Sequence, residues 1–193
     1  MKNLHSYFEP VNSELYSNKS RWETTQIGRL IDTHIDGFFP DLKSAKIAIF
    51  NISEYNGSRN SVAKSDCKIR ALFYSFHHHK LPSVADLGIL KLMPERKDTF
   101  EKIQSVCEVL LHNGILPCII GGGHDLSYAI YKAYASLDKY INLSVVDSKF
   151  DIGLEDDNLA SFSHLGKMIA HSPSHLFHYT NLGYQSYFVS SIA

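Results

Sequence analysis

The segment 115–151 constrains the fold of this chain more than any other part of the sequence. Its first apolar stretch, Ile115–Ile120, is bounded by glycines and contains β-branched residues, which predicts a strand buried on both faces. Apolar residues then recur at three- and four-residue spacing from Leu126 to Tyr134, as on a helix with one buried side. A second apolar stretch, Ile141–Val146, predicts another strand. Strand, helix and strand of these lengths indicate a βαβ unit with two parallel strands.

Side chains that can bind metals follow both of these strands. The loop after the first strand consists of Gly121, Gly122, Gly123, His124 and Asp125. Asp125 is placed to favour the N-terminus of the helix. Asp147 and Asp151 follow the second strand and, on an extended backbone, project to one side. Because the carboxyl ends of parallel strands share one edge of a sheet, we expect these groups to meet there. Imidazole nitrogen and carboxylate oxygen suit Mn, Fe, Co or Zn.

Two motifs in this segment resemble those of a known family. GGGHDLSYA (121–129) followed by VVDSKFD (145–151) resembles the ureohydrolases, the family of arginase, agmatinase and formimidoylglutamase, and is closest to the formimidoylglutamase-like branch. The resemblance implies a three-layer α-β-α fold with a mostly parallel sheet, lacking the family's C-terminal strands. It implies metal-dependent hydrolysis of a guanidino or formimino C–N bond in a small-molecule substrate, with Mn(II) as cofactor. It also implies that His124, Asp147 and Asp151 are metal ligands.

The sequence departs from the family pattern at two points. Lys149 stands where the family has a ligating histidine, and a lysine ammonium has no lone pair with which to bind a metal. Its charge is instead suited to neutralise Asp147 and Asp151 in place of a cation. No Asp-x-Asp motif follows Asp151, so three of the family's six ligands are present. We therefore expect this chain alone to be inactive. Three alternatives are left open: a one-metal site, a metal-free structural or binding protein, and an N-terminal fragment of an active hydrolase.

The two central strands pose a pairing problem. The resemblance implies that in longer relatives they are not neighbours, because C-terminal strands lie between them. Unpaired backbone groups on buried strand edges are costly. We therefore predict that the two strands pair directly in this chain, or that the exposed sheet edges mediate homo-oligomerisation.

The composition of the chain is that of an ordinary globular protein. Its 193 residues, 44% of them hydrophobic, predict a single incomplete arginase-like domain, with 1–40 as a capping segment and 45–193 as the α/β body. A net charge of −1 provides no electrostatic basis for binding nucleic acid or a membrane surface. The three cysteines have unrelated spacings, and the first residues form no apolar signal segment. Free thiols and a cytoplasmic location are expected.

The other elements are predicted from periodicity. Strands are expected at 45–52, 84–90, 176–182 and 187–190, and helices at 23–34, 65–76, 98–113 and 162–170. The core face of the helix at 65–76 is expected to consist of Ile69, Leu72, Phe73 and Phe76. His77, His78 and His79 are adjacent in the chain and cannot converge on a metal, so they are interpreted as a solvated helix end. Satisfied or solvated side chains, rather than ligands, are expected at His164, His171, His175 and His178.

Overall fold

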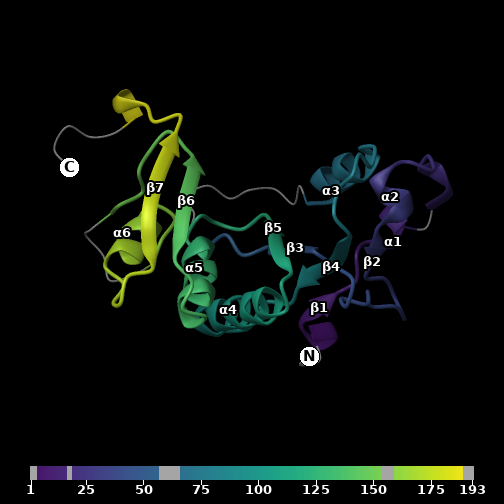
Figure 1. The fold of residues 1–193 in the computed structure, drawn as a ribbon, viewed down its shortest axis with the longest axis horizontal. Helices are drawn as coiled ribbons and strands as arrows, with labels where there is room; N and C mark the ends of the chain where they lie inside the picture. Colours follow the sequence, from purple (N-terminus) through teal and green to yellow (C-terminus); the bar gives the residue numbers. More distant parts are fainter. Residues whose placement is uncertain (1–3, 17–18, 57–65, 154–158, 189–193) are drawn as a thin grey trace. The chain divides into compact units, whose positions relative to one another are not determined.

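The computed structural model describes residues 4–16, 19–56, 66–153 and 159–188 (Figure 1). Contacts divide the chain into two compact units. Unit 1 contains residues 1–55, 61–99 and 109–122, and unit 2 contains residues 56–60, 100–108 and 123–193. Among the described helices, none combines the length and the apolar character needed to cross a membrane.

Unit 1 is built on a sheet whose centre is parallel. Its strands are β1 (Phe8–Glu9), β2 (Asp32–Thr33), β3 (Ile47–Asn51), β4 (Val84–Leu90) and β5 (Leu116–Ile120). The order is β1-β4-β3-β5, with β2 also paired to β4; β1 is antiparallel to β4 and the other pairs are parallel. Ile49 of β3 lies opposite Asp86 of β4 and Cys118 of β5. The strands predicted at 45–52 and 84–90 are therefore confirmed.

Short helices accompany this sheet. They are η1 (Leu4–Tyr7), α1 (Ser13–Tyr16), η2 (Lys19–Arg21), α2 (Ile27–Leu30) and α3 (Asp66–Ser75). The helix predicted over 23–34 shrinks to α2, because the chain turns extended at Ile31 and enters β2. Helix α4 (Arg96–His112) contributes its ends to unit 1 and residues 100–108 to unit 2.

The predicted core face of α3 is correct for Phe73, which packs against the hydrophobic core, but is wrong for the other three residues. Ile69, Leu72 and Phe76 are 48, 61 and 53% exposed, whereas Arg70 and Tyr74 are buried. The Arg70 guanidinium donates to Asp86 Oδ2 from Nε at 2.7 Å and to Oδ1 from Nη2 at 3.1 Å, and Tyr74 donates its hydroxyl to Oδ2 at 2.9 Å. A charged group can be buried when it is paired and hydrogen-bonded. The aspartate on β4 therefore selects the polar side of the helix for the interior.

Unit 2 contains a second, two-stranded sheet with its helices. The elements are α5 (Leu126–Ser136), β6 (Ile141–Val146), α6 (His164–Ile169), β7 (Leu176–Leu182) and η3 (Ser186–Phe188). Strands β6 and β7 run parallel, with Leu143 opposite Tyr179. Helices α5 and α6 are in contact, and the buried residues of this unit include Leu126, Ala129, Ala133, Leu165 and Met168. The second strand expected at 187–190 is instead the short helix η3 where it is described.

The predicted pairing of the two central strands is also wrong. Strand β5 pairs with β3 in unit 1, and β6 pairs with β7 in unit 2. Helix α5 thus connects strands of different sheets rather than closing a βαβ unit within one sheet. Leu116 in β5 is 52% exposed and Val146 in β6 is 83% exposed, so neither strand is buried on both faces. The partner of β6 is β7, about 30 residues further along the chain. Hydrophobic periodicity predicts that each strand exists but not which strands pair.

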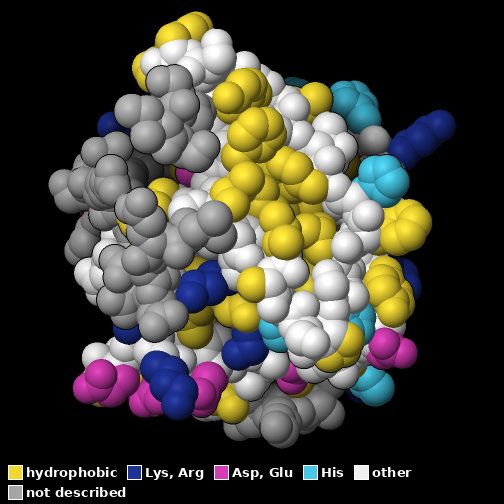
Figure 2. Space-filling view, turned by 90° about the vertical axis from the view of Figure 1, so that its left-hand side faces the viewer, with side chains coloured by type: hydrophobic (Ala, Val, Ile, Leu, Met, Phe, Trp, Pro, Cys, Tyr) yellow, Lys and Arg dark blue, Asp and Glu magenta, His cyan; other side chains and the backbone are white. Residues whose placement is uncertain are grey.

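Hydrophobic side chains remain exposed on the strands of unit 2. Val146, Phe177 and Leu182 are 83, 72 and 55% exposed. The face of the molecule drawn in Figure 2 carries a continuous band of hydrophobic side chains. The free thiols predicted for Cys107 and Cys118 are present, with the first buried and the second exposed.

Candidate metal centre

The loop between β5 and α5 requires glycine. Gly121 and Gly122 have φ values of +82° and +84°, in the left-handed region that disfavours a Cβ atom. A Cβ on Gly121 would also lie 2.8 Å from the hydroxyl oxygen of Tyr55, closer than carbon and oxygen normally approach. The glycines therefore let the backbone turn sharply out of the strand. His124 follows this turn and lies just before α5.

His124 faces the two aspartates that follow β6. Its Nδ1 lies 3.2 Å from Asp147 Oδ2 and 3.3 Å from Asp151 Oδ2. All three residues belong to unit 2, so their geometry is internal to one compact unit. Asp151 has a φ of +51°, which non-glycine residues seldom adopt. A carboxylate held in this conformation at a cluster of ligand groups is typical of a functional position.

Asp125 is the N-cap residue of α5, as its position in the sequence predicted, although its side chain makes no capping hydrogen bond. Its buried carboxylate instead accepts a hydrogen bond from Ser161 Oγ at 2.7 Å. Asp125 therefore fixes the loop that carries Ser161, next to the cluster, rather than adding a ligand to it.

Lys149 does not stand between the two aspartates. Its backbone N–H donates to Asp147 Oδ1 at 3.1 Å, but its side chain is exposed. Within the described part of the chain, its ammonium forms no ion pair with Asp147 or Asp151; the imidazole of His124 occupies that place. The raised pKa of His124 follows, first because Asp151 accepts a hydrogen bond from it and then because both carboxylates attract its proton, against the opposing effect of burial.

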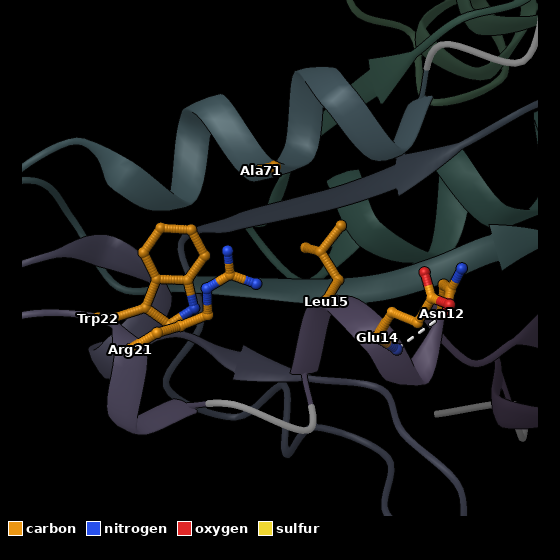
Figure 3. A pocket seen from close by; sticks show the side chains of 6 residues that line it. All are labelled: Asn12, Glu14, Leu15, Arg21, Trp22 and Ala71. Carbon is orange, nitrogen blue, oxygen red and sulfur yellow. Dashed lines mark hydrogen bonds between the residues drawn. The ribbon is translucent and has the colours of Figure 1, made fainter.

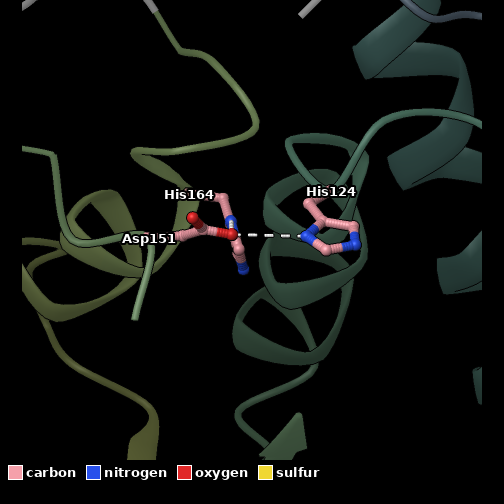
Figure 4. Close-up of side chains that lie close together, drawn as sticks. All are labelled: His124, Asp151 and His164. Carbon is pink, nitrogen blue, oxygen red and sulfur yellow. Dashed lines mark hydrogen bonds and ion pairs between the residues drawn. The ribbon is translucent and has the colours of Figure 1, made fainter. Parts of the chain in front are cut away.

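A second histidine, which the sequence did not single out as a candidate ligand, lies at this cluster. His164 is the first residue of α6, is 4% exposed, and has its Nδ1 3.9 Å from Asp151 Oδ2. Its ring centroid lies 5.7 Å from that of His124. Figure 4 shows the side chains of His124, Asp151 and His164 close together. Burial lowers the pKa of His164. Nothing in the sequence separates His164 from the other C-terminal histidines; only the position of α6 does.

Those other histidines have ordinary partners. His171 Nδ1 is 3.1 Å from the Tyr128 hydroxyl, and His175 Nε2 is 3.1 Å from Asp138 Oδ1. His77 is exposed and pairs with the Thr25 hydroxyl. These contacts match the expectation of satisfied or solvated side chains.

The sequence model of the arginase family matches residues 57–189. This chain belongs to the arginase family. The predicted family is thereby confirmed. The matched range contains both of the motifs on which the resemblance rested.

Solved structures show the same arginase-like fold. Trypanosoma cruzi formiminoglutamase with Mn²⁺ is 18% identical, with a TM-score of 0.68 over 79% of this chain and 57% of that protein. Bacillus subtilis formimidoylglutamase is 16% identical, with a TM-score of 0.68 over 80 and 53% of the two chains. A hypothetical agmatinase from Burkholderia thailandensis is 15% identical, with a TM-score of 0.65 over 77 and 51%. The arginase-family chain thus spans little more than half of each. A search of curated proteins gives no match.

The donor atoms suit a divalent transition metal of the kind that this family implies. Two carboxylates and an imidazole supply oxygen and nitrogen ligands with enough negative charge for a dication. The donor atoms of His124 and Asp147 lie 3.2 Å apart, close enough for both to bind one ion. One ion could therefore replace the proton that now links His124 to the aspartates.

Unit 1 contains a pocket of a different kind. Its volume is about 220 Å³, and its lining consists of Asn12, Glu14, Leu15, Arg21, Trp22 and Ala71 (Figure 3). None of the site residues predicted from the sequence lines it. The metal cluster, rather than this pocket, is therefore the candidate site of the arginase-family chain.

Proposed function

We propose that this chain binds a divalent metal ion, with Mn(II) as the family ion, through His124, Asp147 and Asp151. The proposal is supported above all by the position of His124 Nδ1, within 3.3 Å of a carboxylate oxygen of each aspartate. The inherited reaction is hydrolysis of a guanidino or formimino C–N bond of a small molecule. A bound metal would supply a Lewis acid and a source of hydroxide for that reaction.

We further propose that the 193-residue chain alone does not carry out this hydrolysis. Lys149 occupies the place of one ligand, and the residues after Asp151 contain no Asp-x-Asp motif. A two-metal centre needs ligands on both ions, and these three side chains cannot provide them. The chain's own residues would therefore hold a metal without assembling the family's dinuclear site.

The test is a titration of purified, chelator-stripped protein with Mn(II) by calorimetry, with metal content checked by elemental analysis. Asp151→Asn is the informative variant, because it removes a charged ligand and asparagine tolerates positive φ. Asp138→Asn is the matched control, since Asp138 also has a φ of +51° in unit 2 but lies outside the cluster. We expect binding by the wild type and by the control, and a loss in Asp151→Asn. Absence of binding by the wild type would refute the proposal.

A screen for urea released from guanidino compounds, and for formamide released from formimino compounds, tests the second statement. We expect no release by the Mn(II)-loaded chain. Turnover that disappears in Asp151→Asn would show that the chain is an active hydrolase.

A metal-free role is the second candidate. The observation that favours it is the His124 imidazole between two carboxylates, because an imidazolium there would neutralise one of their charges. This candidate predicts no Mn(II) binding, so the same titration separates it from the first. Self-association through sheet edges remains a prediction. Sedimentation velocity of the wild type and of Phe177→Lys, which places a charge on a side chain of β7 that is 72% exposed, tests it.

A further inference from the structure

Helix α6 brings a second imidazole to the proposed metal site. His164, Asp151 and His124 each offer one ligand atom, and these atoms lie within 4.8 Å of one another. Two ligands bound at about 2.1 Å to one ion are at most about 4.2 Å apart. These three residues therefore need to approach by at most about 0.6 Å, which side-chain rotation can provide.

The hydrogen bonding of His164 leaves Nε2 as the nitrogen that is free to bind a metal. Its Nδ1 lies 2.8 Å from the carbonyl oxygen of Ser161. A carbonyl oxygen only accepts, so Nδ1 carries the hydrogen and Nε2 carries the lone pair of the neutral ring. Metal-ligating histidines commonly donate their other N–H to a backbone carbonyl, which fixes the ring's orientation. His164 already has this arrangement.

The backbone holds α6 against the strand end that carries Asp151. A Cβ on Gly166, two residues after His164, would overlap the carbonyl oxygen of Ile152. A Cβ on Gly153 would lie 2.6 Å from the carbonyl oxygen of Phe162. Glycine at both positions thus allows the start of α6 to pack directly on the residues that follow Asp151. The approach of His164 to the aspartate is a consequence of close backbone packing.

We infer that His164 replaces the ligand lost at Lys149, and that one divalent transition-metal ion binds here to His124, Asp151 and His164, with Asp147, which lies 3.2 Å from His124, as the fourth ligand. The inference rests on the proposed function. Two imidazoles and two carboxylates form a neutral set with a dication, and their donor types suit Mn, Fe, Co or Zn. The centre differs from the family's pair of ions because its fourth ligand comes from α6 and its stoichiometry is one metal per chain.

The experiment compares metal binding by the wild type, His164→Asn and His171→Asn. Asparagine can still donate to the Ser161 carbonyl but has no group in the place of Nε2. His171 is also in unit 2 and bonds to Tyr128, outside the cluster, so its variant is the matched control. Each protein is stripped of metal, checked by circular dichroism, and titrated with Mn(II) by calorimetry and with Co(II) by visible absorption.

We expect one ion per wild-type chain and a Co(II) spectrum that changes in His164→Asn. Affinity should fall by at least about tenfold in this variant, since even outer-shell partners alter metal affinity by 10–100-fold. The control should bind like the wild type. Binding of two ions, or equal affinity and an unchanged Co(II) spectrum in His164→Asn, would overturn the inference while the proposed function stands. No binding by the wild type would overturn both.

A measurement on the wild type covers the case in which His164→Asn does not fold. Zinc is added to protein with ¹⁵N-labelled histidine, and the imidazole nitrogens are followed by NMR. Shifts at the ligating nitrogens of two rings, assigned to His124 and His164, support the inference. A shift at His124 alone would overturn it.

Discussion

Replacing Arg70 by methionine should destabilise unit 1 by about 3–5 kcal/mol, the usual loss when one partner of a buried ion pair is removed. Arg70 and Asp86 have side chains that are 2 and 0% exposed. Methionine fills much of the space of the arginine stem but cannot donate hydrogen bonds. The substitution thus removes two hydrogen bonds to Asp86 and one of 2.8 Å to the Gly88 carbonyl.

The size of the loss in stability depends on the hydrogen-bond donors that Asp86 keeps in Arg70→Met. Asp86 keeps the hydroxyl of Tyr74 and the backbone N–H of Gly88, at 2.9 Å each. Those neutral donors do not balance a buried negative charge, and the Gly88 carbonyl loses a charged donor. With a urea dependence of about 2 kcal/mol per molar, the unfolding midpoint should fall by about 1.5–2.5 M.

The assay is urea unfolding followed by tryptophan fluorescence. Trp22 is the single tryptophan of the chain, and its ring packs edge-on against Tyr74 with centroids 6.1 Å apart. Its emission therefore reports on the neighbourhood of the network. Arg29→Met is the matched control, because Arg29 is exposed, and its effect should stay within about 0.5 kcal/mol.

A double substitution sharpens the test. Arg70→Met with Asp86→Leu removes both charges, so no buried carboxylate is left uncompensated. Apolar replacement of a buried pair is often close to neutral, and we expect the double variant to regain at least half of the lost stability. A loss below about 1 kcal/mol in Arg70→Met would refute the argument.

Three further predictions concern single positions. Lys149→His should raise Mn(II) affinity by about tenfold or more, measured by calorimetry; unchanged affinity would contradict a decayed metal site. Gly88→Ala should lower stability by more than about 2 kcal/mol, because φ is +88° and a Cβ would overlap the Glu9 carbonyl oxygen. Gly114→Ala, with φ of +71° and open space, is its control and should lose less. Burial lowers the pKa of His34 in the folded protein from 6.5. Its contribution to the free energy of unfolding is therefore complete above pH 6.5 and is lost as the pH falls towards the folded pKa. His34→Asn should reduce the pH dependence of the urea unfolding midpoint between pH 5.5 and 7.5. An unchanged pH dependence would show that His34 does not contribute to it.

Local patterns in the sequence were sufficient for much of the secondary structure and for the family. β4 and β7 have the predicted bounds, and α4 lies within two residues of its predicted ends. The order of a glycine turn, His124, and two aspartates after the next strand indicated a metal site. These signals are short-range, because hydrophobic period and turn chemistry act over a few neighbouring residues.

Tertiary structure decided which groups meet across long separations. Arg70 is buried because Asp86 lies on the facing strand, and periodicity assigns such a charged residue to the surface. Strand β6 pairs with β7, although β5 is the strand that precedes it in the chain, on the other side of helix α5. His164 lies near Asp151 because glycine lets α6 pack closely, whereas Lys149, next to the same aspartates in sequence, has an exposed side chain. The sequence by itself determined most of the elements and three candidate ligands; backbone packing placed the fourth candidate, His164, beside them.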